Sequence, residues 1–70
     1  MRHILTIQYL EKRVQILTDG DRKITGVLKG YDVFLNITLM DAIETLSLDK
    51  MSLGLAVIRG NSIVLLEALS

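Results

Sequence analysis

From residue 13 onward, apolar side chains recur at every second position, and this period of two is what most limits the fold. Val14 and Ile16 alternate with Arg13 and Gln15, which is the pattern of a strand with one buried face. Further strand-like runs are predicted at 22–30, 33–44, 53–58 and 62–68. The chain is therefore expected to be all-β over most of its length.

Turn signals separate these runs. Asp19-Gly20 between two strand-like runs is a strong hairpin signal. Residues 30–32 and 59–61 also have the composition of turns, and the more polar residues 45–52 predict a loop. Turns this short connect antiparallel strands.

Two further features complete the predicted architecture. Gly26 lies inside the second run, where a glycine usually marks a bend, and a bent strand can take part in both sides of a small barrel. Ile4, Ile7 and Leu10 have helical spacing, so a short amphipathic helix is predicted over about 4–12. We expect this α-helix to be followed by a strongly bent five-stranded antiparallel sheet.

Length and composition point to association with other chains. The chain has 70 residues, no cysteine and one histidine, His3, which predicts a single domain over 1–70 without disulfides, metal or cofactor. A domain this small buries a modest core, yet half of its residues are apolar. Some of these apolar side chains are therefore expected to face a neighbouring chain.

The last two predicted strands are the expected contact surfaces. Residues 53–58 and 62–68 are short and almost entirely aliphatic. Exposed strands of this composition aggregate unless another strand covers them. Strand addition between subunits would provide that cover.

Charge and motif content exclude several classes of function. The net charge is zero, whereas proteins that bind duplex DNA have a strong basic excess. Single-stranded nucleic acid remains possible, because stacking requires less charge. No apolar run approaches the roughly 20 residues of a membrane span. No catalytic constellation is visible, so an enzyme is not expected.

Two segments of the sequence resemble the halves of the bipartite Sm motif. The first is Gly26-Val-Leu-Lys-Gly-Tyr-Asp-Val-Phe-Leu-Asn36, continuing to Glu44, and the second is Ile58-Arg-Gly-Asn-Ser-Ile63. The chain thus resembles the Sm/LSm family over nearly its whole length. The first half of the motif is placed at about 14–44, the loop at 45–52 and the second half at about 53–67.

The resemblance implies the Sm fold, a small SH3-like barrel, in a ring of seven related subunits. Residues 57–63 and 66–69 are most similar to G-type subunits. The strands at 53–59 and 62–67 would then pair with E-type and D-type neighbours. Such a ring holds uridine-rich single-stranded small nuclear RNA in the particles that splice pre-mRNA, in the nucleus and the cytoplasm.

Two relatives within the family are alternatives. A G-type LSm ring would bind RNA 3′ ends in the U6 particle or in mRNA decay. An archaeal-type protein would form a cytoplasmic ring of seven identical subunits. A different class, a peptide-binding barrel that never contacts RNA, would have no need of the polar residues in the two turns.

The resemblance also implies one nucleotide pocket in each subunit. Phe34 would stack on one face of a base, and the planar guanidinium of Arg59 on the other. Taken alone, Phe34 would more often be a core residue, and Arg59 a solvated residue in a hairpin turn.

Polar groups would complete this pocket. Asn36 carries an amide with a donor and an acceptor, which suits the mixed edge of uracil. The N–H of Gly60 could reach a base carbonyl, and Asn61 adds a contact. Asp32 is expected to hold Asn36 in place rather than to contact RNA. Taken alone, Asn36 and Asp32 would be ordinary turn residues.

Overall fold

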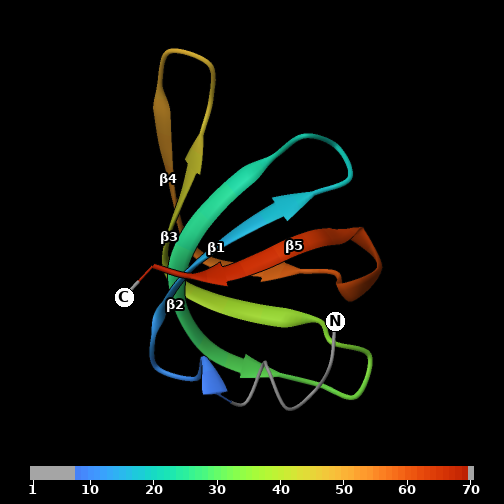
Figure 1. Ribbon diagram of the computed structural model, residues 1–70. Coiled ribbons are helices and arrows are strands. Elements are labelled where there is room, and N and C mark those ends of the chain that lie inside the picture. Colours follow the sequence, from blue (N-terminus) through green and yellow to red (C-terminus); the bar gives the residue numbers. More distant parts are fainter. Residues whose placement is uncertain (1–7, 70) are drawn as a thin grey trace.

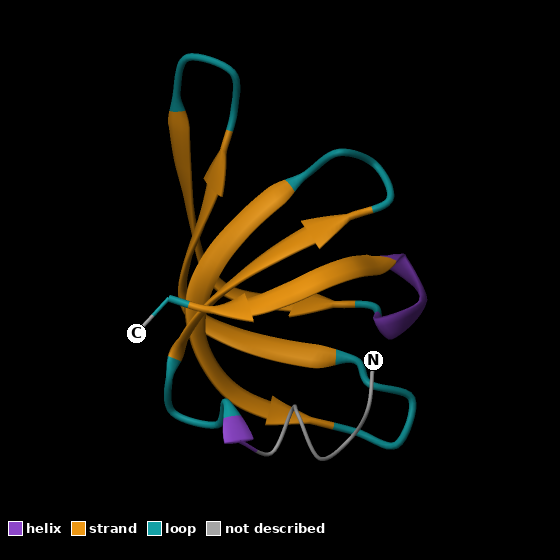
Figure 2. Ribbon diagram, viewed as in Figure 1, coloured by secondary structure: helices purple, strands orange, loops and turns teal. Residues whose placement is uncertain are grey.

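The sheet has the strand order β4-β3-β2-β1-β5, and all its neighbouring strands are antiparallel. The computed structural model describes residues 8–69, and Figures 1 and 2 show the strands curling into a barrel-like shape. The strands are β1 Arg13–Thr18, β2 Lys23–Tyr31, β3 Ile37–Thr45, β4 Lys50–Ile58 and β5 Ile63–Ala68, with a 3₁₀ helix, η1, at Gly60–Ser62. The predicted bent sheet of five antiparallel strands is confirmed.

The predicted helix over 4–12 falls partly outside the described residues, which begin at Gln8. Gln8 is helical and residues 9–12 form a turn, in which the N–H of Lys12 donates to the carbonyl of Tyr9 at 3.0 Å. Tyr9 and Leu10 pack against the core. The last part of the predicted helix is therefore a turn that covers the sheet.

The core lies inside the curve of the sheet. Buried apolar side chains of the first four strands form it: Val14, Ile16, Ile24, Leu28, Ile37, Leu39, Ala42 and Ile58. In β1 these side chains alternate with more exposed ones, as the period of two predicts. From β5, Ile63 and Leu66 only pack against the core while partly buried.

The bend at Gly26 is visible in the strand pairing. The β2–β3 register shifts between Thr25 and Val27. A Cβ atom on Gly26 would lie 3.1 Å from both the Cβ of Leu39 and the carbonyl oxygen of Met40. The two strands approach so closely here that a Cβ atom would require them to shift by a few tenths of an ångström, and a close backbone approach is a usual reason for a glycine within a strand.

The hairpin between β1 and β2 is confirmed, with one difference in its geometry. The N–H of Thr18 donates to the carbonyl of Arg22 at 2.9 Å, and that of Asp21 to the carbonyl of Thr18 at 3.1 Å. The residue with positive φ is Asp21, at 60°, rather than Asp19 or Gly20. A three-residue hairpin loop combines a type I turn with a left-handed third residue, and Asp21 takes that position.

The predicted start of the third strand is wrong. The strand was expected from residue 33, but β3 begins at Ile37. Residues 32–36 instead close a turn in which the N–H of Leu35 donates to the carbonyl of Asp32 at 3.0 Å. The aspartate side chain stabilises this turn, and apolar residues within it continue the alternating pattern without being in a strand.

The predicted loop at 45–52 is also too long. β3 extends to Thr45 and β4 starts at Lys50, so only 46–49 connect them. The hairpin projects away from the rest of the sheet (Figure 1). Residues 46–52 are all exposed, including the apolar Leu46, Leu48 and Met51, so backbone pairing rather than burial holds this part of the hairpin together.

The two edges of the sheet are β4 and β5. Large apolar side chains remain exposed on both: Leu55 and Val57 at 67% each on β4, and Val64 at 63% on β5. Residues 53–58 were expected to need cover from another chain, and within this single chain β4 has large exposed apolar side chains. The strands predicted to need partners are thus the two that have a free edge.

Candidate nucleic-acid interface

The loop at 32–36 positions the predicted site residues, and it repeats the construction of the β1–β2 turn. The N–H of Asp32 donates to the carbonyl of Asn36 at 3.2 Å. Leu35 takes the left-handed conformation, with φ 60°. Because this loop has the same three-residue geometry, the side chains of residues 33 and 34 project from its outer curve.

The carboxylate of Asp32 organises this loop. Its Oδ1 accepts hydrogen bonds from the backbone N–H groups of Phe34 at 2.8 Å and Asn36 at 3.0 Å. Its Oδ2 accepts a third from the Asn36 side chain at 3.0 Å. The backbone N–H of Asn36, and then the other donors, hold the pKa of Asp32 below its usual range, because they stabilise the charged form. Asp32 is thus an anion that fixes the loop.

Asn36 connects this loop to η1. Its Oδ1 accepts a hydrogen bond from the N–H of Gly60 at 2.9 Å, while its Nδ2 donates to Asp32. These two partners fix which end of the amide is oxygen and which is nitrogen. One amide hydrogen and one acceptor lone pair remain available for another molecule.

Gly60 lies directly against the backbone of the 32–36 loop. A Cβ atom at this position would lie 2.2 Å from the carbonyl oxygen of Phe34 and 2.7 Å from that of Leu35. Only a glycine allows this approach. The N–H of Gly60, which we expected to donate to a base carbonyl, instead donates to Asn36, so Gly60 acts in this structure by joining the two loops.

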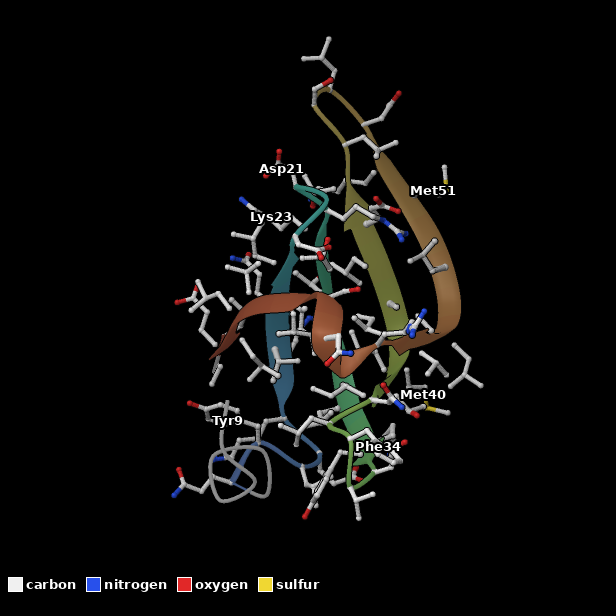
Figure 3. All side chains as sticks on the ribbon, turned by 90° about the vertical axis from the view of Figure 1, so that its right-hand side faces the viewer. Tyr9, Asp21, Lys23, Phe34, Met40 and Met51 are labelled. Carbon is white, nitrogen blue, oxygen red and sulfur yellow. The ribbon has the colours of Figure 1, made fainter. Side chains whose placement is uncertain are left out.

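An open hollow of about 410 Å³ lies between the two loops, lined by Val33, Phe34, Leu35, Asn36, Arg59 and Asn61. It contains four of the predicted site residues, with Asp32 and Gly60 directly behind them. Phe34 is 76% exposed and extends from the lower end of the molecule in Figure 3. The exposure contradicts the alternative of a core phenylalanine.

Val33 and Leu35 are lining residues that the sequence did not single out. Val33 is 75% exposed next to an exposed aromatic ring. Adjacent exposed apolar residues in a turn are an unusual arrangement and could have drawn attention to Val33. The inclusion of Leu35 depends on its left-handed backbone, which no sequence pattern indicates.

The chemistry of the hollow suits a flat, polar-edged ligand. Within residues 8–69, no hydrogen bond or ion pair holds the guanidinium of Arg59, so its planar face is available for stacking. The exposed ring of Phe34 can contact the apolar face of such a ligand. The oriented amide of Asn36 can form hydrogen bonds with its polar edge. Among the described residues no cluster of His, Cys, Asp and Glu could hold a metal ion.

A bent five-stranded antiparallel sheet with two aliphatic edge strands defines the class of small β-barrel proteins. In this chain an open hollow lies between two turns at one end of the barrel. The LSM domain model matches residues 5–68 of the chain. The chain belongs to the LSM domain family.

Its relatives include curated G subunits. The chain is 46% identical over 63 residues to the small nuclear ribonucleoprotein G of Schizosaccharomyces pombe, covering 89% of this chain and 82% of the relative. It is 48% identical over 66 residues to the protein of that name from Saccharomyces cerevisiae, covering 89% and 86%. The resemblance to G-type subunits is confirmed.

Solved structures share the fold. The SmAP1 heptamer of P. aerophilum has a TM-score of 0.89 at 22% identity, covering 96% of this chain and 90% of that one. The Pyrococcus abyssi Sm protein, solved in complex with a uridine heptamer, has a TM-score of 0.81 at 26% identity, covering 97% and 99%.

Among the described residues, the structure has no helix of the length and hydropathy that crossing a bilayer requires.

Proposed function

We propose that this chain is a structural RNA-binding subunit of a heptameric Sm ring that holds uridine-rich single-stranded RNA in small nuclear ribonucleoproteins. Its relatives at 46% and 48% identity are named small nuclear ribonucleoprotein G. A structural neighbour was solved with a uridine heptamer. The single observation that carries the proposal is the oriented amide of Asn36 in the lining of an open hollow.

The amide of Asn36 suits the edge of uracil. Uracil presents an N–H donor next to a carbonyl acceptor. Asn36 keeps one free amide hydrogen and one free lone pair after bonding to Asp32 and Gly60, so it can pair with both groups at once. Because its two fixed partners prevent the amide from turning over, the order of donor and acceptor is constant.

The two faces of the base are assigned to Phe34 and Arg59. Both line the hollow, one with an exposed aromatic ring and the other with a guanidinium that has no partner among the described residues. Stacking on such groups is worth roughly 1–3 kcal/mol per base. Asn61, which also lines the hollow, would contact the base or its sugar.

A ring reconciles weak single pockets with stable RNA retention. The net charge of the chain is zero, so broad phosphate attraction does not supply the affinity. Several pockets that share one RNA strand raise each other's occupancy through effective concentration. RNA affinity is then a property of the ring rather than of one subunit.

The edge strands would form the ring contacts. We assign β4 and β5 to pairing with E-type and D-type neighbours. The chain is then a single Sm domain without enzymatic activity. It would work in the nucleus after assembly in the cytoplasm. Native mass spectrometry of the chain alone and with candidate partners tests this assignment. A heptamer formed by the chain alone would favour the archaeal type, and sequencing of the RNA that co-purifies would separate the Sm from the LSm alternative.

The nucleotide pocket is tested by Arg59→Ala and Asn36→Ala. Arg59→Ala is expected to weaken binding of a uridine heptamer by roughly 1–3 kcal/mol for every altered pocket, the size of a stacking contact. Asn36→Ala is expected to weaken it through the lost hydrogen bonds to the base. In both cases the ring should still assemble. Arg13→Ala and Gln15→Ala are matched controls, because these residues lie on β1 outside the hollow. Unchanged RNA binding by both test variants, in a ring whose wild type binds, would overturn the pocket assignment.

A further inference from the structure

The short helix η1, which carries the site residues next to Arg59, lies between two turns. In Figure 1 the β1–β2 turn, η1 and the 32–36 loop follow one another along the same side of the molecule. Figure 3 agrees: Asp21 marks the β1–β2 turn at one end and Phe34 marks the 32–36 loop at the other. The nucleotide hollow uses only the second of these turns.

Each turn makes one hydrogen bond to the η1 region. On the side of the hollow, the N–H of Gly60 donates to Asn36. On the opposite side, the N–H of Asp19 donates to the carbonyl of Ser62 at 2.8 Å. Within this segment, the N–H of Ser62 donates to the carbonyl of Arg59 at 3.0 Å, so a constraint on Ser62 also constrains the backbone at Arg59.

Side-chain packing does not replace the bond from Asp19. Behind Arg59 lies a second hollow, of about 310 Å³, with the β1–β2 turn on one side and β4 on the other. Arg59 lines both this hollow and the nucleotide hollow. Packing holds the neighbours of Arg59, since Ile58 is buried and Gly60 lies against the 32–36 loop. Arg59 itself lines open space on two sides, so the hydrogen bonds at Gly60 and Ser62 add to the constraint on its backbone.

The β1–β2 turn is rigid enough to act as such a support. The side chain of Thr18 is buried and its Oγ1 accepts a hydrogen bond from the N–H of Arg22 at 3.2 Å. The guanidinium of Arg22 then bonds both carboxylate oxygens of Glu44 on β3, each at 2.8 Å. A bidentate pair of this kind fixes orientation as well as distance.

We propose that the β1–β2 turn is a rear support of the nucleotide site, with Asp19 as a positioning residue that acts through its backbone N–H. The inference rests on the proposed function, because it concerns how firmly Arg59 is held against a base. Loss of the Asp19 bond lets the 59–62 segment shift toward the second hollow. The stacking geometry of Arg59 is lost while the pocket residues themselves remain.

Asp19→Pro removes this single donor. Neither Asp19 nor Gly20, the two central residues of the turn, has positive φ, as a type I turn requires. Asp19 is the second residue of this turn, a position that favours proline. Thr18 is in a strand, as a residue before proline prefers. Asp19→Ala is the matched control, because it keeps the N–H and removes only the side chain.

Rings that contain each variant are compared for binding of a uridine heptamer. Asp19→Pro is expected to lower affinity roughly three- to tenfold, the size of one net hydrogen bond, and Asp19→Ala to bind as the wild type. A heptamer with one 4-thiouridine provides a local readout. In rings with Asp19→Pro, its photocrosslink to this subunit is expected to fall. Its crosslinks to the other subunits of the same ring serve as the reference.

The outcomes separate this inference from the proposed function. No uridine binding by the wild-type ring would contradict the proposed function itself. Wild-type binding together with equal binding and crosslinking by Asp19→Pro would overturn the rear support alone, as would an equal loss in Asp19→Ala. If Asp19→Pro does not assemble, Arg22→Lys is tested in its place. This variant keeps the positive charge but loses the bidentate bond to Glu44. Undiminished uridine binding by rings that contain it would also overturn the inference.

Discussion

At the scale of single residues, Gly60 is the described glycine at which an added Cβ would lie nearest to other atoms. Its backbone contacts the carbonyl groups of Phe34 and Leu35, and an added Cβ would overlap both. The overlap is with backbone atoms, which cannot move aside as a flexible side chain would. Gly60→Ala must therefore separate η1 from the 32–36 loop.

We expect Gly60→Ala to lower the free energy of unfolding by about 1–3 kcal/mol, the usual cost of overpacking, and to abolish uridine binding. Chemical denaturation and RNA titration measure the two effects. Gly30→Ala is the control, since nothing lies within 4 Å of its added Cβ. Equal stability of the two variants would show that η1 and the loop can separate without cost.

The residue scale also shows where sequence information ends. The residue types at Asp32, Asn36 and Arg59 were sufficient to predict a pocket through the family resemblance. The donor of Gly60 was assigned to RNA because its sequence position says nothing about which acceptor lies nearest. That acceptor belongs to Asn36, 24 residues away in the chain, and only the folded backbone brings the two together.

At the scale of elements, the prediction succeeded where burial controls the pattern. β1 alternates because one face meets the core, and the sequence shows that alternation directly. It failed at residues 33–36, where Asp32 diverts the backbone into a turn, and at 50–52, where β4 continues as an exposed hairpin. In those stretches, backbone and side-chain hydrogen bonds decide the structure, and the apolar pattern of the sequence does not reveal them.

The edge strand β4 gives the element-scale prediction. Leu55 is 67% exposed on this edge, so Leu55→Glu is expected to leave the fold intact and prevent ring assembly, because a charge would be buried where strands pair. Light scattering measures the mass and circular dichroism the fold. Leu48→Glu is the matched control, because Leu48 is 96% exposed in the connection between β3 and β4. This variant is expected to assemble as the wild type does.

Assembly of Leu55→Glu at wild-type concentrations would exclude the free edge of β4 from the ring contacts. Loss of assembly in both leucine variants would indicate instead that added negative charge, wherever it lies, keeps the subunits apart. Only loss confined to Leu55→Glu agrees with strand pairing.

At the scale of the whole molecule, two depressed carboxyl pKa values tie stability to pH. The hydrogen bonds from Arg22, with its charge, lower the pKa of Glu44, and the backbone N–H of Asn36 chiefly lowers that of Asp32. One carboxylate joins the β1–β2 turn to β3, and the other holds the 32–36 loop. Acid therefore acts on both turns that flank η1.

The sign of the effect follows from the direction of the shifts. A carboxyl group with a lower pKa in the folded chain adds stability above its unfolded pKa, about 4 for these residues, and loses it as the pH falls through the folded value. The melting temperature is expected to be flat near neutral pH and to fall below about pH 4. Protein concentration is held constant, because association also stabilises the fold.

Glu44→Gln identifies the part of this acid sensitivity that comes from the Arg22–Glu44 pair. The variant is expected to melt at a lower temperature than the wild type at pH 7, because Arg22 loses its charged partner, and the two curves should converge as the pH falls. Glu67→Gln is the control, since within residues 8–69 that exposed carboxylate accepts a single side-chain bond, of 3.3 Å from Gln15. The difference in melting temperature depends on pH only if the ionised form of Glu44 stabilises the fold. A constant difference between Glu44→Gln and wild type at every pH would therefore mean that packing at this position matters and the charge of Glu44 does not.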